Sequence, residues 1–284
     1  MHCMKNVLYV NKPSGMTSFD VCYRLRKVLG TKKIGHTGTL DPLASGVMIV
    51  LFDKATKANQ FLVSDNKEYI AKVKFGIETD TLDIDGNVIK ESPYSLPNKE
   101  KIIEVLKSFI GPGKQVVPMT SAISVNGKRL YQYQREGKEV ELPVRDINVY
   151  EIELLEMFDD GFSFRSKVSS GTYIRALSRD ILKKLDQIGT LESLVRTAVD
   201  EITINQCDKL SEIENGNYSV HDLYDLLSSK YPAVEYKNTA DIINGKKIIL
   251  PIKEDRVLIV HDDEALAVYD RNDDDAYSCT RGLW

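Results

Sequence analysis

The sequence predicts an α+β protein, in which a large domain of mixed strands and helices precedes a small β-domain. Over the first 230 residues, stretches with strand patterns alternate with amphipathic stretches of helical period, and runs of strands lie between them. From residue 231 the pattern changes to short strand-like stretches. We therefore expect domains over residues 1–230 and 231–284, and a chain of 284 residues is long enough for both.

The first elements are a strand, a turn and a helix. Residues 7–10 form an apolar strand that runs into a turn over residues 11–15. Ser18 is expected to cap a helix whose apolar residues fall on one face, and Gly30 is expected to end it. The apolar residues of this helix are Val21, Leu25, Val28 and Leu29.

Four further elements are expected before residue 80. A loop rich in glycine and threonine covers residues 31–42 and leads into a buried strand over 47–52. A helix over 55–63 and an alternating strand over 68–75 follow.

The rest of the large domain continues the same patterns. An amphipathic helix over 99–110 is expected to end at Gly111-Pro112-Gly113. We then expect strands over 147–157 and 162–169 and a helix over 173–185. The small domain is expected to hold strands over 247–252, 257–261 and 265–269, with a turn at Asn244-Gly245.

The composition is that of an ordinary globular protein. Hydrophobic residues make up 42% and charged residues 28%, which excludes collagen-like, coiled-coil and wholly disordered chains. No apolar run approaches the roughly 18 residues of a membrane helix. Residues 1–12 are too polar for a secretory signal, so we expect a cytoplasmic protein with no membrane contact. Four scattered cysteines without a CxxC pair indicate neither a zinc site nor a disulfide framework.

Charge is distributed unevenly along the chain. Residues 1–60 carry nine Lys/Arg and three Asp/Glu, for a net charge of +6, whereas residues 200–284 carry nine and 18, for −9. A phosphate backbone responds to a local basic surface rather than to the mean charge, so the N-terminal excess is compatible with a polyanionic substrate. By charge alone, a solvated basic face is the simpler interpretation.

The loop Gly35–Gly46, with sequence GHTGTLDPLASG, carries the most chemical information. Two glycines in its first four residues permit close approach by a ligand. Asp41 precedes a proline, which favours an extended backbone, and the loop feeds a strand that would hold the carboxylate at the edge of a sheet. A nucleophile, a general base, a metal ligand and a turn former all remain open for Asp41. The metal role is the weakest, because His36 is five residues away and no other ligands cluster there.

This loop resembles the motif around the catalytic aspartate of TruB-type tRNA pseudouridine synthases. Three more segments resemble that family's motifs in the same order, and together they cover most of residues 7–200. They are residues 11–18, Ser121-Ala122 with residues 127–131, and residues 170–175.

The resemblance implies three catalytic residues. Asp41 matches the catalytic aspartate. Tyr69 matches the tyrosine that stacks on the target base and is placed to handle a proton. Arg175 matches the arginine that pairs with the catalytic carboxylate, which favours the charged form of that carboxylate. Without the resemblance, Tyr69 would be interpreted as a core residue and Arg175 as a packing or capping residue.

Four other positions match substrate-site residues of the family. His36 matches a histidine that helps to hold the RNA open around the flipped base, and Lys12 matches a structural lysine near the active site. Leu194 matches an apolar residue that lines the pocket, and Tyr173 lies two residues before Arg175. Ordinary core, turn or capping roles are the alternatives for these residues.

A basic segment over residues 121–146 is expected to contact RNA. Lys128, Arg129 and Tyr131 combine cations for phosphates with an aromatic ring for an exposed base. In the family this region includes a mobile loop that closes over the RNA. The alternative is a solvated helix face with Tyr131 buried. Ser124 and Val195 depart from the residues expected there, lysine and arginine, which bears on RNA affinity rather than on catalysis.

The resemblance implies a pseudouridine synthase core, with a mixed, mostly antiparallel sheet flanked by helices and a small PUA-like C-terminal domain. It implies conversion of uridine 55 in the tRNA T loop to pseudouridine, by base flipping and an aspartate nucleophile. No cofactor and no metal is expected. The expected partner is the T arm of tRNA, bound by a monomer without an obligate protein partner. A guide-RNA-dependent relative and an RNA-folding protein are the alternatives.

Overall fold

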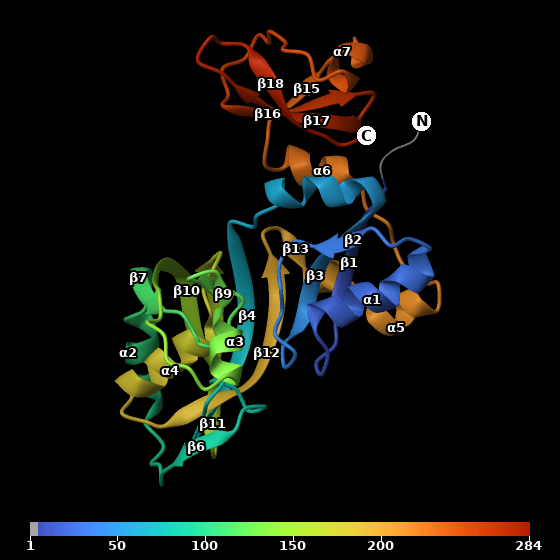
Figure 1. Ribbon diagram of the computed structural model, residues 1–284. Coiled ribbons are helices and arrows are strands. Elements are labelled where there is room, and N and C mark those ends of the chain that lie inside the picture. The colour runs from blue at the N-terminus through green and yellow to red at the C-terminus, as the bar shows by residue number, and fades with distance from the viewer. Residues whose placement is uncertain (1–4) are drawn as a thin grey trace. The chain divides into compact units, whose positions relative to one another are not determined.

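The structure is a computed structural model that describes residues 5–284, so the first four residues of the N-terminal segment lie outside it. The chain divides into two compact units. The first unit combines the residues up to 41 with 47–63 and 205–284, and the second combines 42–46 with 64–204. Strands and helices are mixed in both units (Figure 1), as an α+β fold requires. No helix of the described residues is long and apolar enough to cross a membrane.

The first unit begins with a small group of strands. Strand β1 lies between β14, its parallel partner, and β3, and β2 pairs with β3 in antiparallel orientation. Helices α1 and α5 contact one another. The elements are β1 (Val7–Lys12), α1 (Ser18–Leu29), β2 (Ile34–His36), β3 (Ser45–Phe52), β14 (Asp208–Lys209) and α5 (Leu210–Glu214).

The cap of helix α1 differs from the prediction. Thr17, not Ser18, is the N-cap: its hydroxyl accepts a hydrogen bond from the Asp20 amide at 3.0 Å, and the Asp20 carboxylate accepts one from the Thr17 amide at 2.9 Å. This reciprocal pair is a capping box, which satisfies two amides that the helix itself cannot. Ser18 is buried and bonds instead to the backbone of Leu40.

Two other predictions in this unit need correction. The loop predicted over 31–42 contains strand β2. The helix predicted over 55–63 is a 3₁₀ helix, η1 (Asp53–Phe61), shifted by two residues. Its spacing of apolar residues fits either type of turn, so the pattern could not distinguish them.

The C-terminal residues form a small four-stranded sheet in the order β15-β16-β17-β18, drawn in red in Figure 1. Its core includes Ile259, Tyr269 and Tyr277. The strand predicted over 247–252 is wrong: only Ile248 bridges to Tyr277, and Ile249 is 84% exposed. The domain boundary at residue 231 stays a prediction. The elements here are α6 (Leu223–Ser228), β15 (Ala233–Glu235), α7 (Thr239–Ile243), β16 (Arg256–His261), β17 (Glu264–Arg271) and β18 (Tyr277–Gly282).

The second unit is built on five long strands in the order β12-β4-β11-β10-β7, each antiparallel to its neighbours. Helix α4 contacts β12 and β7, and helix α2 contacts β10. This is the mostly antiparallel, helix-flanked sheet that the resemblance implied. The elements are β4 (Asn66–Phe75), α2 (Lys99–Lys107), β7 (Gly111–Val116), β10 (Val144–Phe158), β11 (Gly161–Ser169), α4 (Ile174–Lys184) and β12 (Gly189–Val199).

Two features of this unit were not predicted. Gly111-Pro112-Gly113 does not simply end a helix but begins strand β7, and residues 189–199 form strand β12. Shorter elements complete the unit. They are β5 (Ile77–Thr79), β6 (Val88–Glu91), β8 (Ser124–Val125), β9 (Lys128–Arg129), α3 (Leu130–Arg135), β13 (Ile202–Thr203) and the turn η2 (Ile204–Gln206).

The first residues of β3 belong to this unit and pair in parallel with β12, Ser45 opposite Val195 and Gly46 opposite Arg196. Gly46 has a φ of +104°, and a methyl group there would lie 2.2 Å from the carbonyl oxygen of Arg196. Only glycine permits both this backbone angle and this approach. The last glycine of the Asp41 loop is therefore required by strand pairing.

We expect Gly46→Ala to lower the free energy of unfolding by more than about 1 kcal/mol, because the methyl group must displace the β12 backbone. Urea denaturation of the full chain measures this. Gly35→Ala is the matched control, since among residues 5–284 no atom beyond the glycine and its two chain neighbours lies within 4 Å of a methyl group at that position. Equal stability of the two variants would contradict the close approach.

Candidate active site

In the first unit, the backbone immediately before Asp41 is held in place by hydrogen bonds. Ser18 Oγ donates to the Leu40 carbonyl at 3.1 Å and accepts from the Leu40 amide at 2.9 Å, and both residues are buried. These two bonds anchor the residue immediately before Asp41 to the first turn of α1. The side chain of Asp41 is partly exposed. An anchored backbone with an accessible carboxylate is suited to a reacting group.

Lys12 and His36 also lie in the first unit. Lys12 is fully buried, and its ammonium donates to the carbonyl oxygens of Pro13 at 3.0 Å and Met16 at 2.5 Å. It therefore holds the turn over residues 13–16. His36 is the last residue of β2, is half-buried and stands opposite Val50.

In the second unit, Tyr69 and Leu194 share one face of the sheet. Tyr69 is the register partner of Arg196, and Ala71 is the partner of Leu194. Cross-strand partners project to the same face, so Tyr69, Leu194 and Arg196 are neighbours. Tyr69 and Leu194 are each 7% exposed and Arg196 is 1% exposed. These three residues bring an aromatic ring, an apolar side chain and a buried cation together on this face.

Arg175 is held by a network of polar groups near the start of α4. One terminal nitrogen donates to the Thr81 carbonyl at 2.8 Å and to Thr120 Oγ1 at 2.6 Å, and the other donates to the Thr120 carbonyl at 2.9 Å. A carboxylate oxygen of Asp83 lies 3.7 Å away. Arg175 is 4% exposed, so these partners orient a buried guanidinium in a definite direction.

Tyr173, which caps α4, is fixed through its backbone. The side-chain amide of Gln115 accepts from the Tyr173 amide at 2.9 Å and donates to the Tyr173 carbonyl at 3.1 Å. Gln115 is 2% exposed, so this reciprocal pair gives both its buried side-chain oxygen and its side-chain nitrogen a partner. It joins β7 to the start of α4, two residues before Arg175.

The basic segment forms the hairpin β8–β9 and helix α3. Lys128 makes an ion pair with Glu136 and lies 5.0 Å from the centre of the Tyr133 ring. Arg129 donates to the carbonyl of Ala122. Tyr131 is 36% exposed with Arg135 over its ring, so the alternative of a buried Tyr131 is wrong. Lys128 and Arg129 thus already have partners within the protein. An RNA phosphate would either displace these partners or bind alongside them.

The second unit therefore brings Tyr69 and Leu194 together, and places Tyr173 and Arg175 together at the start of α4. Asp41, His36 and Lys12 belong to the first unit. The pairing of Asp41 with Arg175 stays a prediction.

Several positioning residues were missed at the sequence level. Arg196 follows the noted Val195, and its burial became apparent only with the β4–β12 register. Asp83, Thr120 and Gln115 hold Arg175 or Tyr173. The one available signal was Thr120, which immediately precedes the Ser121-Ala122 motif.

Lys67 is a second cation close to this face. Burial and the positive charge of Arg196 lower its pKa to about 8, against a smaller opposing effect of Asp200. Its ammonium lies 3.5 Å from Ser170 Oγ. Lys67 thus carries a destabilised charge on β4 itself, two residues before Tyr69.

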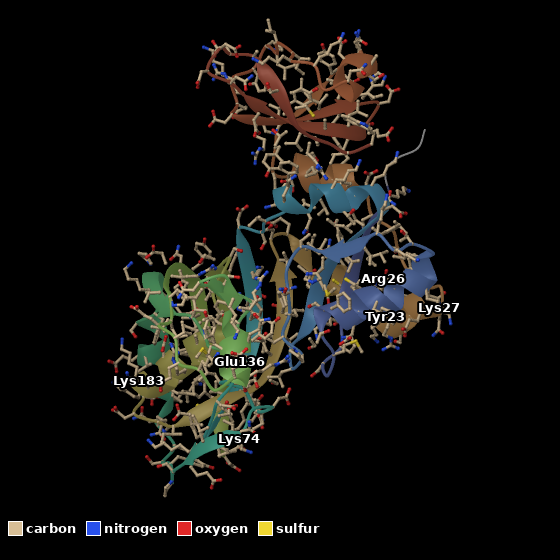
Figure 2. The ribbon with its side chains drawn as sticks, viewed as in Figure 1. Tyr23, Arg26, Lys27, Lys74, Glu136 and Lys183 are labelled. Carbon is tan, nitrogen blue, oxygen red and sulfur yellow. The ribbon has the colours of Figure 1, made fainter. Side chains whose placement is uncertain are left out.

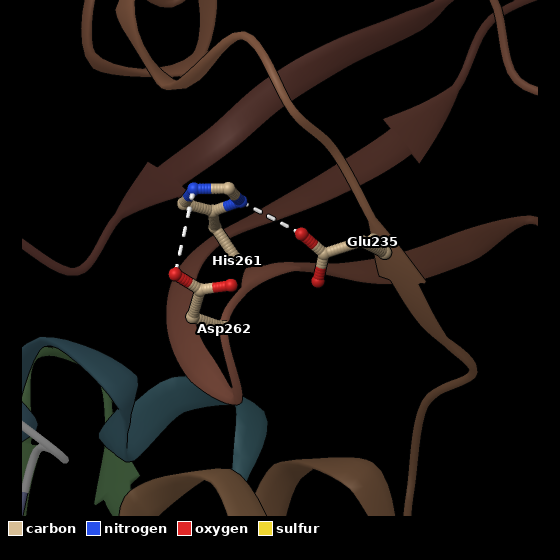
Figure 3. Close-up of side chains that lie close together, drawn as sticks. All are labelled: Glu235, His261 and Asp262. Atoms are coloured by element: carbon tan, nitrogen blue, oxygen red, sulfur yellow. Dashed lines mark hydrogen bonds and ion pairs between the residues drawn. The ribbon is translucent and has the colours of Figure 1, made fainter. Parts of the chain in front are cut away.

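One group of three possible metal ligands occurs within residues 5–284, and Figure 3 shows it as Glu235, His261 and Asp262. His261 Nδ1 is 2.7 Å from Glu235, while Nε2 on the other side of the ring is 3.9 Å from Asp262. A metal ion binds one ring nitrogen, and here each nitrogen faces a different carboxylate. This arrangement suits a ring that contacts one carboxylate from each side rather than a metal centre.

Comparison with known proteins gives consistent matches. A model of the TruB family pseudouridylate synthase N-terminal domain matches residues 26–174. The tRNA pseudouridine synthase B of Caldanaerobacter subterraneus subsp. tengcongensis is 43% identical over 246 residues, 85% of each chain. That of Bacillus cereus is 39% identical over 286 residues, 95% of this chain and 93% of its own. A chain in a crystal structure of a Cbf5-Nop10-Gar1 complex superposes with a TM-score of 0.73 at 25% identity, covering 100% of this chain and 86% of that one.

Stability should depend on pH through Lys67. Its folded pKa of about 8 is below the usual 10.5, so the unfolded state binds more protons between these values and stability rises with pH across this window. We expect a gain of about 1–3 kcal/mol between pH 8 and 10.5. Urea denaturation at several pH values measures it. Lys67→Met should flatten this part of the profile, and an unchanged slope in that variant would assign the effect to other groups.

Proposed function

The chain belongs to the TruB family of pseudouridylate synthases, and from that premise we propose that it converts uridine 55 in the T loop of tRNA to pseudouridine. The structural observation that carries this proposal is the buried face of the second unit. There Tyr69 and Leu194 lie side by side in the β4–β12 register. A ring beside an apolar side chain is a suitable receptor for one flipped base.

The reaction is an isomerisation. The bond between ribose C1′ and N1 of uracil breaks, the base turns, and C1′ bonds to C5, which then loses its proton as N1 regains one. No atom is added and no electron is transferred overall, so the chemistry requires no redox partner. The protein must hold the detached base, stabilise charge at C1′ and move protons.

Asp41 is the proposed nucleophile. Its carboxylate would either attack C1′ directly or assist departure of the base through a glycal, and both routes require the ionised form. Anchoring of Leu40 by Ser18 supports this role, because it holds the preceding backbone rigid. Arg175, oriented by Thr81 and Thr120, is proposed to stabilise the Asp41 carboxylate.

Tyr69 is proposed to replace the stacking that the base loses when it leaves the RNA, and its hydroxyl to handle a proton. Leu194 would exclude water, which strengthens electrostatic interactions in the site. Lys12 and His36 would support the side of the Asp41 loop that faces the RNA. Tyr173 would support the N-terminal end of α4. Lys128, Arg129 and Tyr131 would contact the T arm.

The T arm of tRNA is the proposed substrate, recognised by a cytoplasmic monomer that needs no guide RNA, protein partner, metal or cofactor. A guide-dependent relative would be inactive on a bare stem-loop, which distinguishes the two. An RNA-folding role can coexist with catalysis.

We expect the wild type to convert one loop uridine of an unmodified T-arm stem-loop in the presence of chelator. Asp41→Asn should lower this rate by more than about a thousandfold, on the order of what loss of a nucleophile costs. Release of tritium from C5-labelled uridine measures the reaction. A variant that binds RNA normally but does not modify it supports the assignment, and substantial conversion by Asp41→Asn would contradict it.

Two substitutions should separate the roles of Tyr69. Tyr69→Phe keeps the ring, so RNA affinity should remain while turnover falls by about 10²–10⁴-fold if the hydroxyl handles a proton. Tyr69→Leu removes the ring as well, and binding should weaken by about 1–3 kcal/mol. Single-turnover rates and dissociation constants are measured together. Wild-type turnover in Tyr69→Phe would show that the proton is handled elsewhere.

A further inference from the structure

Helix α1 carries an exposed surface of cations and aromatic rings in the first unit. Figure 2 shows Tyr23, Arg26 and Lys27 together on this helix. A cavity of about 750 Å³ lies beside them, lined also by Lys32 and by Glu214 of α5. None of these residues belongs to the motifs assigned above to catalysis.

The rings on this surface are largely exposed to solvent. Phe19 is 62% exposed and Tyr23 is 64% exposed. The guanidinium carbon of Arg26 lies 5.6 Å from the centre of the Phe19 ring and 5.9 Å from that of Tyr23. Rings and guanidinium thus form a preassembled stacking surface. Arg26 Nε is buried and has no hydrogen-bond partner within residues 5–284, so part of its bonding capacity is unused.

The positive charge of the surface is only partly neutralised. Arg24 makes a two-point bond to Glu214, at 2.6 and 2.8 Å, and this engages the carboxylate that lines the cavity. Arg26 and Lys27 lie in the last turn of α1, where cations interact favourably with the helix dipole. The helix dipole does not account for the position of Lys32, which lies beyond the end of α1. Nor does it account for the exposure of the two rings.

Cations beside exposed rings are the chemistry of single-stranded RNA recognition, in which bases stack on rings and cations hold phosphates. Interfaces between proteins share the aromatic rings and arginine but are depleted in lysine, and this surface carries both Lys27 and Lys32. We propose that the surface of Phe19, Tyr23, Arg26, Lys27 and Lys32, with its cavity, binds a single-stranded segment of the RNA substrate. This rests on the proposed function, because it assumes that the substrate is RNA. It adds a second RNA-binding surface, separate from the residues assigned to the chemistry.

Binding of two labelled RNAs to the full chain tests the proposal: an unmodified tRNA transcript and octauridylate. Tyr23→Ala should weaken binding of octauridylate at least about fivefold, the lower end of what one base–ring stack contributes. Tyr23→Phe should retain binding. The double variant Lys27→Gln/Lys32→Gln should reduce the magnitude of the salt slope of log K by about 0.7 for each phosphate that the protein no longer neutralises.

The matched control is Lys107→Gln/Lys183→Gln, which removes two exposed lysines from α2 and α4. Unchanged affinity and slope in the α1 variants, or an equal loss in the control, would overturn the proposal and would point instead to a protein partner or to non-specific charge. If Tyr23→Ala fails to fold, the lysine pair and its control still decide.

Failure of the proposed function has a different signature. If the wild type forms no pseudouridine but the α1 variants still lose octauridylate binding selectively, the surface is an RNA site of a protein with another activity. If the wild type forms pseudouridine and the variants bind RNA as the wild type does, only the inference about α1 fails.

Discussion

The pairing of β12 with β4 on one side and with the start of β3 on the other is the constraint on which the buried face of the second unit depends. Side chains alternate along a strand, so a slip of one residue would turn Tyr69 and Leu194 to the opposite face. Gly46 secures one side of β12, because its lack of a side chain lets the Arg196 carbonyl approach closely. The register thus determines what surrounds the proposed base-binding site.

The opposite face of the same strands is held by charge. Arg165 of β11 bonds to Glu68 of β4 at 2.6 Å and to Glu151 and Glu153 of β10 at 2.9 and 2.7 Å. Partial burial disfavours the charge on Glu68, but bonds from Thr197 and Arg165 outweigh this and keep the pKa of the carboxyl below its usual value. An ion network that spans three strands opposes a shift of register, because any slip would separate several partners at once.

The buried cations explain why the candidate site needs so much supporting structure. A guanidinium or ammonium inside a protein is costly unless its donors are satisfied. Arg175 therefore needs Thr81 and Thr120, and Lys12 needs the carbonyls of its own turn. Lys67, which is partly buried and lies next to another cation, has a lowered pKa instead. Gln115 likewise provides hydrogen-bond partners for the backbone amide and carbonyl of Tyr173, because polar groups at the start of a helix cannot be buried unpaired.

Local signals in the sequence determined the positions of the strongly periodic elements, the α+β class and the small C-terminal sheet. The motifs in the sequence also indicated the family, and they indicated Asp41, Tyr69 and Arg175 as candidate catalytic residues. Only the tertiary structure decided that Thr17 caps α1, that residues 189–199 are a strand, and that Arg196 lies beside Tyr69. The reason is physical: capping and register depend on which groups lie across the chain. Buried and half-buried residues are mixed irregularly along β12, so its sequence shows no clear alternation before its partners are known. The partners of Arg175 come from residues some 55 and 94 positions away, a separation that no local pattern encodes.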